Sequence, residues 1–579
     1  MKASKTKRIY LIILVSIFIF RLNLYAAPSQ IPSTQTAGGL DKMQEDQTKS
    51  KKLEQKIDTK REKPEIEEKF EEETKVPESE KVFINKINVE GAVLLTLDEV
   101  SKITSKYEKK KLSIGQIQRV ADLITDVYRT KGYPTSRAYI PPQTIGKDGS
   151  VLIRVVEGKV GDISVKGNKW FKARLYKKKI QLKQNDLFNY SSLQRSLTLI
   201  NERPDRFAKA ILVPGKTPGS TDIVIEAKDR FPIHVGYTHD NYASRYVGRD
   251  RDSVTFEDNN LLGFDDQLYF QFQRSEDSLS TLKTGRYLFP LTNALNLGIN
   301  AAYAKTKLGR EFAPLDSLGK STIIGVFLNQ ALISTEALDL RLNLAFDYKK
   351  IRNYLLGQEV SRDDARVLKA GFDLDNTDKF GRTLFTAEMD AGIPNIMGGL
   401  RSKDSRTTRI GSGGRFFKGV FSLYRSQPMP FSTSLLFKNT AQFTNNTLTA
   451  AEEFQLGGPY SVRGYAPGEV AGDRGLYSAV EWSLPYYFIP KKLQIPFTKE
   501  TWRDTTRLVL FYDWGTVRSN SNVDDIKSRT LKSAGVGFRF NLTNQLSAKA
   551  ELAWPIGGPK SSDTARQHMQ PWVEFTVKI

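Results

Sequence analysis

Hydrophobic and polar residues alternate over most of the C-terminal part of the chain, residues 231–579. The alternating segments are about ten residues long, a common strand length, and Gly, Asn, Asp and Ser separate them. Successive side chains of a strand point to opposite faces of the sheet. In the clearest segment, one face carries Leu338, Leu340, Leu342, Leu344, Phe346 and Tyr348, and the other carries Asp339, Arg341, Asn343 and Asp347. The pattern predicts amphipathic strands throughout this region.

The polar face of these segments is strongly polar, which decides between two kinds of β protein. A strand of a soluble β-sandwich also alternates, but here successive segments set an apolar face against residues such as Gln271 and Gln273. This arrangement suits an antiparallel transmembrane barrel with lipid outside and water inside. At roughly 22 residues per strand and connection, residues 232–579 would form about 16 strands. The last segment, residues 572–579, is amphipathic too, as closure against the first strand requires.

Residues 82–230 have a different pattern, which predicts two small α/β units in tandem, residues 82–158 and 159–230. Each unit contains one amphipathic helix, which aligns Ile117 with Tyr128 in the first unit and starts at Ser191 in the second. The expected strands are residues 82–89, 136–140, 150–156, 161–165, 208–213 and 222–226. The edge strands of such sheets can bind an extended polypeptide by strand addition. The alternative is that the edges pack on each other.

The N-terminal 81 residues divide into two segments. Residues 1–27 have basic residues, an apolar run from Ile9 to Phe20 and small residues Ala26 and Ala27, which predicts a cleaved secretory signal rather than a membrane anchor. Residues 28–81 form a linker rich in Lys, Glu, Asp and Gln that cannot bury a core. Within this linker, residues 41–60 are either a short polar helix or disordered.

Composition argues against an enzyme and against nucleic-acid binding. The chain has no cysteine and three histidines, and two of these, His234 and His239, are predicted on opposite faces of one strand. No nucleophile elbow, P-loop or metal-ligand spacing is present, so we expect no catalytic residue, no metal and no cofactor. The net charge of +22 is spread among acidic residues along the chain. It is better explained by solvation of a lumen and its loops than by recognition of a nucleic acid.

The most specific motif is GGPYSVRGYAPGEVAGDRG, residues 457–475, which is followed by FYDWG, residues 511–515. These strings resemble the VRGY loop and the FxDxG strand of the two-partner secretion transporters, the TpsB family of haemolysin and haemagglutinin secretion and activation proteins. The residues that carry the resemblance are Val462, Arg463, Gly464, Tyr465, Phe511, Asp513 and Gly515.

The resemblance implies that Arg463 on a loop folded into the barrel pairs with Asp513. Alternation places Asp513 on the lumenal face if Leu510 and Tyr512 meet lipid. A guanidinium in a narrow barrel needs a counter-charge, and a carboxylate can hold it with two hydrogen bonds. Alone, an Arg-Gly loop would be predicted as a solvated turn; the second motif favours the folded-in loop, whose tight backbone Gly464 would permit.

Further strings resemble the same family. They are GYPTSRAYIPPQ (residues 132–143), VVEG (155–158) and LVPGKTPGSTDIVI (212–225), which are similar to its two POTRA domains, and HDNYASRYVGRDR and NNLLGFDD at the start of the barrel. The resemblance thus covers nearly all of residues 82–579. The chain departs from the family in ending at Ile579 rather than at an aromatic residue, and in the high charge of residues 28–81.

The resemblance implies an outer-membrane transporter with POTRA domains in the periplasm. It would secrete a large partner protein, of adhesin or cytolysin type, to the cell surface without ATP. The POTRA domains would bind the partner as an unfolded chain, and the barrel assembly machinery would insert the barrel among outer-membrane lipids. In the family, a segment ahead of the first POTRA domain can form a helix that plugs the pore. The alternatives are an insertase for outer-membrane barrels, for which more POTRA domains are expected, and a passive porin or receptor, for which none are expected.

Overall fold

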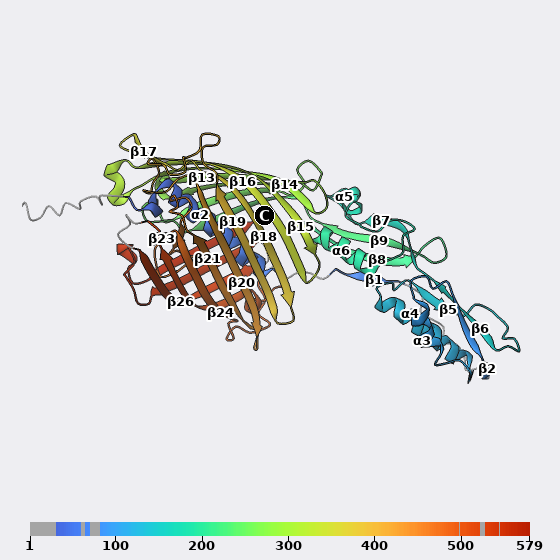
Figure 1. Cartoon of the computed structure of the whole chain (residues 1–579). Coiled ribbons are helices and arrows are strands. Elements are labelled where there is room, and N and C mark those ends of the chain that lie inside the picture. The colour runs from blue at the N-terminus through green and yellow to red at the C-terminus, as the bar shows by residue number, and fades with distance from the viewer. Residues whose placement is uncertain (1–30, 60–63, 70–80, 497, 522–526, 543–544) are drawn as a thin grey trace, which may run out of the picture.

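The alternating C-terminal segments form a closed antiparallel barrel (Figure 1). The computed structural model describes residues 31–59, 64–69, 81–496, 498–521, 527–542 and 545–579. Within these residues the barrel has 16 strands, as the sequence predicts. They are β10 (Ile233–Asp240), β11 (Arg251–Asp258), β12 (Gln267–Ser275), β13 (Ser280–Pro290), β14 (Leu295–Lys307), β15 (Leu318–Ser334), β16 (Leu338–Leu355), β18 (Arg366–Asp378), β19 (Gly381–Gly392), β20 (Phe416–Met429), β21 (Thr433–Thr444), β24 (Arg474–Leu484), β25 (Thr506–Arg518), β26 (Ser528–Leu542), β27 (Leu546–Pro555) and β28 (Gln570–Lys578).

The barrel closes by pairing of its first and last strands. β10 and β28 run antiparallel in register from Gly236 opposite Lys578 to Asp240 opposite Glu574. Val235 and Ile579 extend the pairing, because each backbone N–H donates to the carbonyl oxygen of the other, at 3.1 and 2.9 Å. Because its first and last strands pair, the sheet has no unpaired edge strand, as a sheet in lipid requires.

The two faces of the barrel wall differ as the alternation predicts. In β16, Leu342 and Leu344 are exposed on the outer surface, whereas Asp339 and Asp347 are buried toward the lumen. The expected length of about ten residues is wrong for β15 and β16, which have 17 and 18 residues. These two strands pair along their whole length, and the far end of β16 also pairs with the short strand β17 (Gln358–Arg362). Among the described helices, none is both long and apolar enough to cross a membrane.

The first α/β module precedes the barrel and extends away from it (Figure 1). Its elements are β2 (Val82–Ile84), β3 (Lys86–Glu90), α3 (Leu97–Thr104), β4 (Lys110–Leu112), α4 (Ile114–Thr130), β5 (Arg137–Tyr139) and β6 (Ser150–Val156). The helix α4 starts at a capping box of Ser113 and Gln116 and buries Ile117, Ile124 and Tyr128 against the sheet. The prediction of a single strand over residues 82–89 is wrong in one respect. The strand is interrupted at Asn85, so that β2 pairs with β4 and β3 pairs with β6.

The second module lies between the first module and the barrel. It contains β7 (Lys159–Lys166), α5 (Ala173–Lys177), α6 (Tyr190–Asn201), β8 (Arg206–Pro214) and β9 (Ser220–Asp229). Ion pairs fix it to the barrel, because Asp265 in the turn after β11 lies 2.8 Å from Arg206 and 3.0 Å from Lys179. All three side chains are buried. A short strand from the N-terminal linker, β1 (Ile66–Glu68), pairs in parallel with the outer edge of β8.

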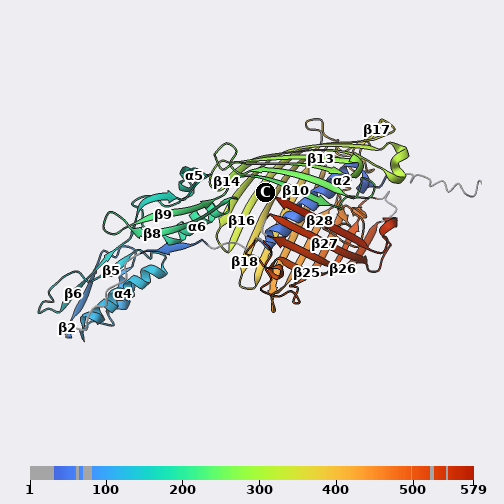
Figure 2. The same ribbon diagram turned by 180° about the vertical axis from the view of Figure 1, so that it is seen from behind.

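The N-terminal linker also contains a helix that crosses the barrel lumen (Figure 2). The 3₁₀ turn η1 (Ser33–Gln35) leads into α2 (Ala37–Asp58), whose N-terminus is capped by the hydroxyl of Thr36. Of the two possibilities left open for residues 41–60, the structure therefore has the helix, over a slightly earlier range. The expected secretory signal, residues 1–27, lies outside the described residues.

Remaining short elements lie in the connections between barrel strands. They are η2 (Glu276–Ser278), η3 (Arg310–Leu315), β22 (Phe454–Leu456), β23 (Val470–Gly472), α7 (Trp502–Thr505) and η4 (Thr564–Arg566). Because β10 enters the barrel from the second module, the strand order defines two ends. We call them the module end, where β10 begins, and the far end, where η1, η3 and β17 lie (Figures 1 and 2).

Candidate functional site

The VRGY motif lies at the tip of a loop that folds from the far end into the barrel. This loop joins β21 to β24 and is braced by the small hairpin of β22 and β23. Val462 and Tyr465 are fully buried in an apolar cluster with Leu456, Tyr477 and Leu531. Only 1% of the Arg463 side chain is exposed. The loop is therefore packed against the inner wall, and the solvated turn is excluded.

Arg463 and Asp513 are in direct contact. The Arg463 guanidinium donates from Nη2 to Asp513 Oδ1 at 2.7 Å and from Nε to Oδ2 at 3.0 Å. The Arg463 backbone N–H also donates to Oδ2 at 3.0 Å, and so does the hydroxyl of Ser533, at 3.0 Å. The guanidinium stacks on the ring of Phe511, 3.4 Å from its centre. This bidentate geometry is the strongest form of an arginine–carboxylate contact.

Glycines allow the loop to lie close to the wall. A Cβ atom on Gly464 would approach Ser533 Cβ to 2.7 Å and the Pro555 backbone nitrogen to 2.8 Å. On the wall, a Cβ on Gly515 would approach the side chain of Leu456 to 2.7 Å. Gly464 therefore allows the loop backbone to approach the backbone of the wall, and Gly515 leaves room for the packed side chains of Leu456 and Val462.

The motifs do not include several other charged residues that surround Arg463. Its Nη1 atom lies 2.8 Å from Glu481 and 3.3 Å from Glu551, which come from β24 and β27. Arg539 bridges the same two carboxylates at 2.7 and 3.1 Å, and Lys438 lies 2.5 Å from Glu481. We call Arg463, Asp513, Glu481, Glu551, Arg539 and Lys438 the clamp cluster. In the sequence, each of the residues outside the motifs is only a single charged residue on the lumenal face of a strand. Many other lumen-lining residues have the same pattern, so the sequence does not single these out.

The helix α2 contacts the clamp cluster and the opposite wall mainly through charged groups. Glu54 accepts a hydrogen bond from Lys438 of the clamp cluster. Elsewhere, Lys49 pairs with Glu388 at 3.0 Å and Lys51 with Glu574 at 2.7 Å. Apolar contacts form small clusters at both ends of the helix. Ala37 and Leu40 pack at its start, and Ile57 at its end joins a cluster with three wall residues, Leu384, Tyr424 and Leu436.

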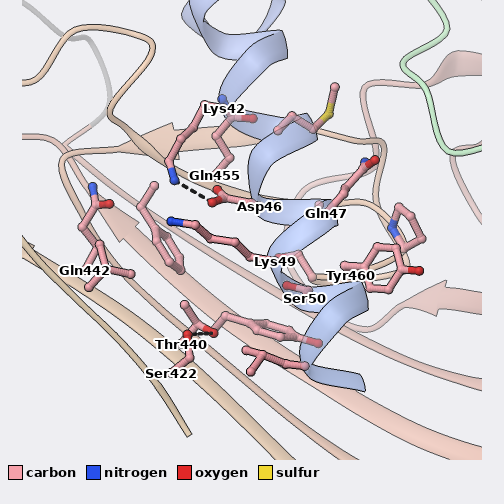
Figure 3. Close-up of a pocket in the computed structure, with 18 residues that line it drawn as sticks. Lys42, Asp46, Gln47, Lys49, Ser50, Ser422, Thr440, Gln442, Gln455 and Tyr460 are labelled. Carbon is pink, nitrogen blue, oxygen red and sulfur yellow. Dashed lines mark hydrogen bonds and ion pairs between the residues drawn. The ribbon is translucent and has the colours of Figure 1, made fainter. Parts of the chain in front are cut away.

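Beside α2 there is a cavity with a mixed polar and apolar lining, shown in Figure 3. Its lining combines helix residues such as Lys42, which bonds to Asp46 at 2.5 Å, with wall residues such as Thr440 and Gln442. Two further lining residues, Tyr460 and Ser461, belong to the folded loop. The helix and loop thus occupy the lumen together, and the cavity lies between them and the wall.

A closed barrel with an apolar outer surface, a charged lumen and α/β modules at one end defines a transmembrane β-barrel of the transporter type. The sequence profile of the haemolysin secretion/activation proteins ShlB, FhaC and HecB matches residues 219–540, and the profile of the ShlB-type POTRA domain matches residues 82–158. The chain belongs to this haemolysin secretion/activation family, since more than half of it matches. The family resemblance of the motifs and the predicted fold class are confirmed.

Individual relatives agree. The heme/hemopexin transporter protein HuxB of Haemophilus influenzae (strain 86-028NP) is 25% identical over 501 residues, which are 83% of this chain and 83% of that protein. The outer membrane transporter CdiB of Dickeya dadantii (strain 3937) is 21% identical over 487 residues, 82% of this chain and 83% of that protein. The solved structure of CdiB from Escherichia coli has a TM-score of 0.71 at 20% identity, covers 93% of this chain and 98% of its own, and supports the fold.

The protein is therefore an outer-membrane transporter of two-partner secretion, which moves a partner protein from the periplasm to the cell surface. The module end of the barrel is periplasmic and the far end is extracellular. The expected function and location are confirmed. The roles of the seven motif residues in transport stay predictions.

Removal of either partner of the Arg463–Asp513 contact should reduce secretion while the barrel still assembles. A buried charge without its partner costs several kcal/mol, whereas barrel closure depends on backbone hydrogen bonds. Arg463→Ala should be the more severe change, because it also removes the counter-charge of Glu481 and Glu551. The measurement is partner in the medium per unit of heat-modifiable transporter, and we expect a loss of about tenfold or more.

The double variant Arg463→Ala/Asp513→Ala should secrete about as well as Arg463→Ala alone, because both changes act on one contact. Arg425→Ala is the matched control. Arg425 forms a similar pair with Asp378 at 2.7 Å, but at the module end and partly exposed, and its loss should leave secretion nearly unchanged. Losses that multiply in the double variant would show that the two residues act separately.

Proposed function

We propose that the lumen is the path of the unfolded partner and that α2 and the folded loop close it between transport events. In this proposal α2 is a removable plug, whereas the loop stays clamped to the wall by Arg463 and Asp513. The partner is of the adhesin or cytolysin type, and its folding outside the cell supplies the energy, without ATP.

The observation that carries the proposal is the kind of contact that holds α2. Its ion pairs with Glu388 and Glu574 and its bond to Lys438 are contacts that water and salt can replace. A helix held by a large apolar face would lose about 25 cal/mol for each Å² exposed on leaving. Here the apolar contacts are small clusters at the two ends of the helix, formed by Ala37 and Leu40 at one end and by Leu53 and Ile57 at the other. Exit of α2 into the periplasm therefore exposes much less apolar surface than a continuous apolar face would.

The two modules are the capture sites of the proposal. Residues 159–230, which repeat the strand–helix–strand order of the matched POTRA domain, would be a second POTRA domain, and residues 231–579 the barrel unit. The ion pairs of Asp265 with Lys179 and Arg206 would keep this second domain at the periplasmic mouth. Sheet edges of the modules suit an extended polypeptide. The barrel assembly machinery would insert the barrel, with β28 and its apolar Val573 and Phe575 as the terminal strand.

A disulfide between α2 and the folded loop should stop secretion if the helix must leave. The chain has no cysteine of its own, so Gly38→Cys/Ala451→Cys introduces a single possible pair. A Cβ on Gly38 would lie 3.1 Å from Ala451 Cβ, slightly closer than the roughly 3.5–4.5 Å of disulfides. We expect at least roughly tenfold less secretion when the pair is oxidised, and recovery on addition of a reductant. The two single variants are the controls, and full secretion with the disulfide formed would exclude the removable plug.

Neutralising the lysines of α2 that pair with the wall should open the pore more often. For Lys49→Gln/Lys51→Gln in planar bilayers, open events should become several-fold more frequent, and high salt should have the same effect on the unchanged protein because ions screen the pairs. Lys52→Gln is the matched control, since among the described residues Lys52 has no carboxylate within 4.0 Å. An equal effect of all three lysines would point to net charge rather than to specific pairs.

A further inference from the structure

One side of the second module carries a concentration of positive charge. Between Asp162 and Asp186 the chain has eight lysines and arginines and no acidic residue, whereas basic and acidic residues are mixed along the first module. We give the name basic face to the exposed residues Lys166, Lys169, Trp170, Lys172, Lys177 and Lys178. Among the described residues, none of these five lysines lies within 4.0 Å of a carboxylate. No close partner within the protein therefore compensates their charge.

The loop that presents the basic face is held in one conformation. The carboxylate of Asp229, at the end of β9, accepts hydrogen bonds from three successive backbone N–H groups, those of residues 169–171, at 2.9, 3.1 and 3.0 Å. Phe171 and Tyr176 are buried in the core of the module. The side chain of Trp170 is left 44% exposed. This exposed ring on an ordered loop, with other exposed apolar side chains beside it, indicates a contact surface.

Contacts with three elements of the barrel place the basic face beside the membrane. The ring of Trp170 packs edge-on against Phe231, just ahead of β10, with 4.9 Å between the ring centres. Arg174 of α5 donates to the carbonyl oxygen of Gly263, between β11 and β12, at 3.2 Å. Asn293, between β13 and β14, donates to the carbonyl oxygen of the residue after α5, at 2.8 Å. Figures 1 and 2 both show α5 beside the ends of the barrel strands. The basic face therefore lies at the level of the periplasmic turns.

The barrel turns next to the basic face expose apolar side chains. Leu261, Leu262 and Phe264, between β11 and β12, are all exposed, and so is Phe231. At the end of a transmembrane barrel such side chains lie in the interfacial layer of the lipid, where aromatic rings are enriched. Because Trp170 contacts Phe231, this apolar surface continues from the barrel onto the module, and the lysines of the basic face flank it.

A surface with exposed rings and apolar side chains among lysines fits the headgroup layer of a membrane. The rings and the aliphatic stems enter the interface, while the ammonium groups remain at the phosphates. Anionic lipids attract such segments within a Debye length, roughly 10 Å at 0.1 M salt. An acidic segment of the secreted partner would also attract the lysines, but it would give no reason for the exposed Trp170 or for its continuity with the barrel turns.

We propose that the basic face binds anionic phospholipids, such as phosphatidylglycerol, in the periplasmic leaflet of the outer membrane. Trp170 enters the interfacial layer beside Phe231, and the lysines bind the lipid phosphates. The lipid then holds the second module on one side, while the ion pairs of Asp265 hold it on the barrel. This contact goes beyond the proposed function and does not depend on whether α2 leaves the lumen.

A fluorescent label on the basic face tests its contact with lipid. Because the chain has no cysteine, Lys172→Cys can be labelled with bimane in the full-length protein, which is placed in nanodiscs with a trace of nitroxide-headgroup lipid. In equal parts of phosphatidylglycerol and phosphatidylcholine, we expect at least about threefold more quenching of the label than in phosphatidylcholine alone. The same label on Lys147→Cys, an exposed position of the first module, should not be quenched. Equal quenching at the two positions, or in the two lipids, overturns the proposal.

Removal of charge separates lipid binding from mere proximity. In the protein labelled at residue 172, Lys169→Gln/Lys177→Gln should lower the quenching in anionic nanodiscs at least about twofold. Salt at 1 M should act in the same direction, because it shortens the Debye length to about 3 Å. The matched control is Lys110→Gln/Lys111→Gln, which removes the same charge from exposed positions of the first module and should change nothing. The same quenching in all these proteins would contradict recognition of anionic lipid.

Secretion and the tryptophan distinguish the membrane from an acidic partner. If Lys169→Gln/Lys177→Gln lowers secretion and leaves the quenching unchanged, the lysines bind the partner, and the proposal is wrong. Trp170→Ser keeps every charge and the backbone N–H groups that bind Asp229, and it should lower the quenching because the ring no longer enters the interface. Quenching that is unaffected by Trp170→Ser excludes the insertion of this ring. Heat-modifiable migration of each variant shows that its barrel is assembled.

Discussion

The structure depends on the contact of Arg463 with a group of carboxylates in a lumen that the loop seals from water. Glu481, Asp513 and Glu551 lie on the inner face of β24, β25 and β27, and all three are completely buried. Buried carboxylates without counter-charge cost several kcal/mol each. Arg463 on the loop neutralises these buried carboxylates, and the carboxylates accept the hydrogen bonds that hold the loop on the wall. The loop and this part of the wall therefore stabilise each other.

The same electrostatics extend to the plug. Lys438 bonds to Glu481 of the wall and to Glu54 of α2, and Lys549 lies between Glu551 and Glu54, at 3.3 and 4.0 Å. Departure of α2 therefore removes one negative charge from a group that is balanced while the helix is present. Water that enters the emptied lumen can solvate the two lysines, whereas Arg463 keeps its carboxylates. In the proposed function, this difference lets one network hold a permanent loop and a removable helix.

Alternation predicts the strands and the closure of the barrel because the inside–outside difference acts on every residue. It cannot predict strand ends such as those of β15 and β16, since residues beyond the lipid are free of that constraint. The VRGY and FYDWG motifs identify Arg463 and Asp513, but Glu481 and Lys438 look like any lumenal charge until the loop is in place. β1 was not foreseen, because three residues in a charged linker carry no periodicity, and their partner, β8, lies more than one module away.

If α2 leaves the lumen as we propose, its return needs no energy source beyond the lumen itself. A polar helix of 22 residues with Gly38 and Gly39 in its first turn is marginal in water. Outside the barrel it therefore loses structure, and the charged wall is where its helical form is most stable. Until α2 returns, Lys438 and Lys549 lack the carboxylate of Glu54. Closure of the lumen then follows from the free energy of these contacts.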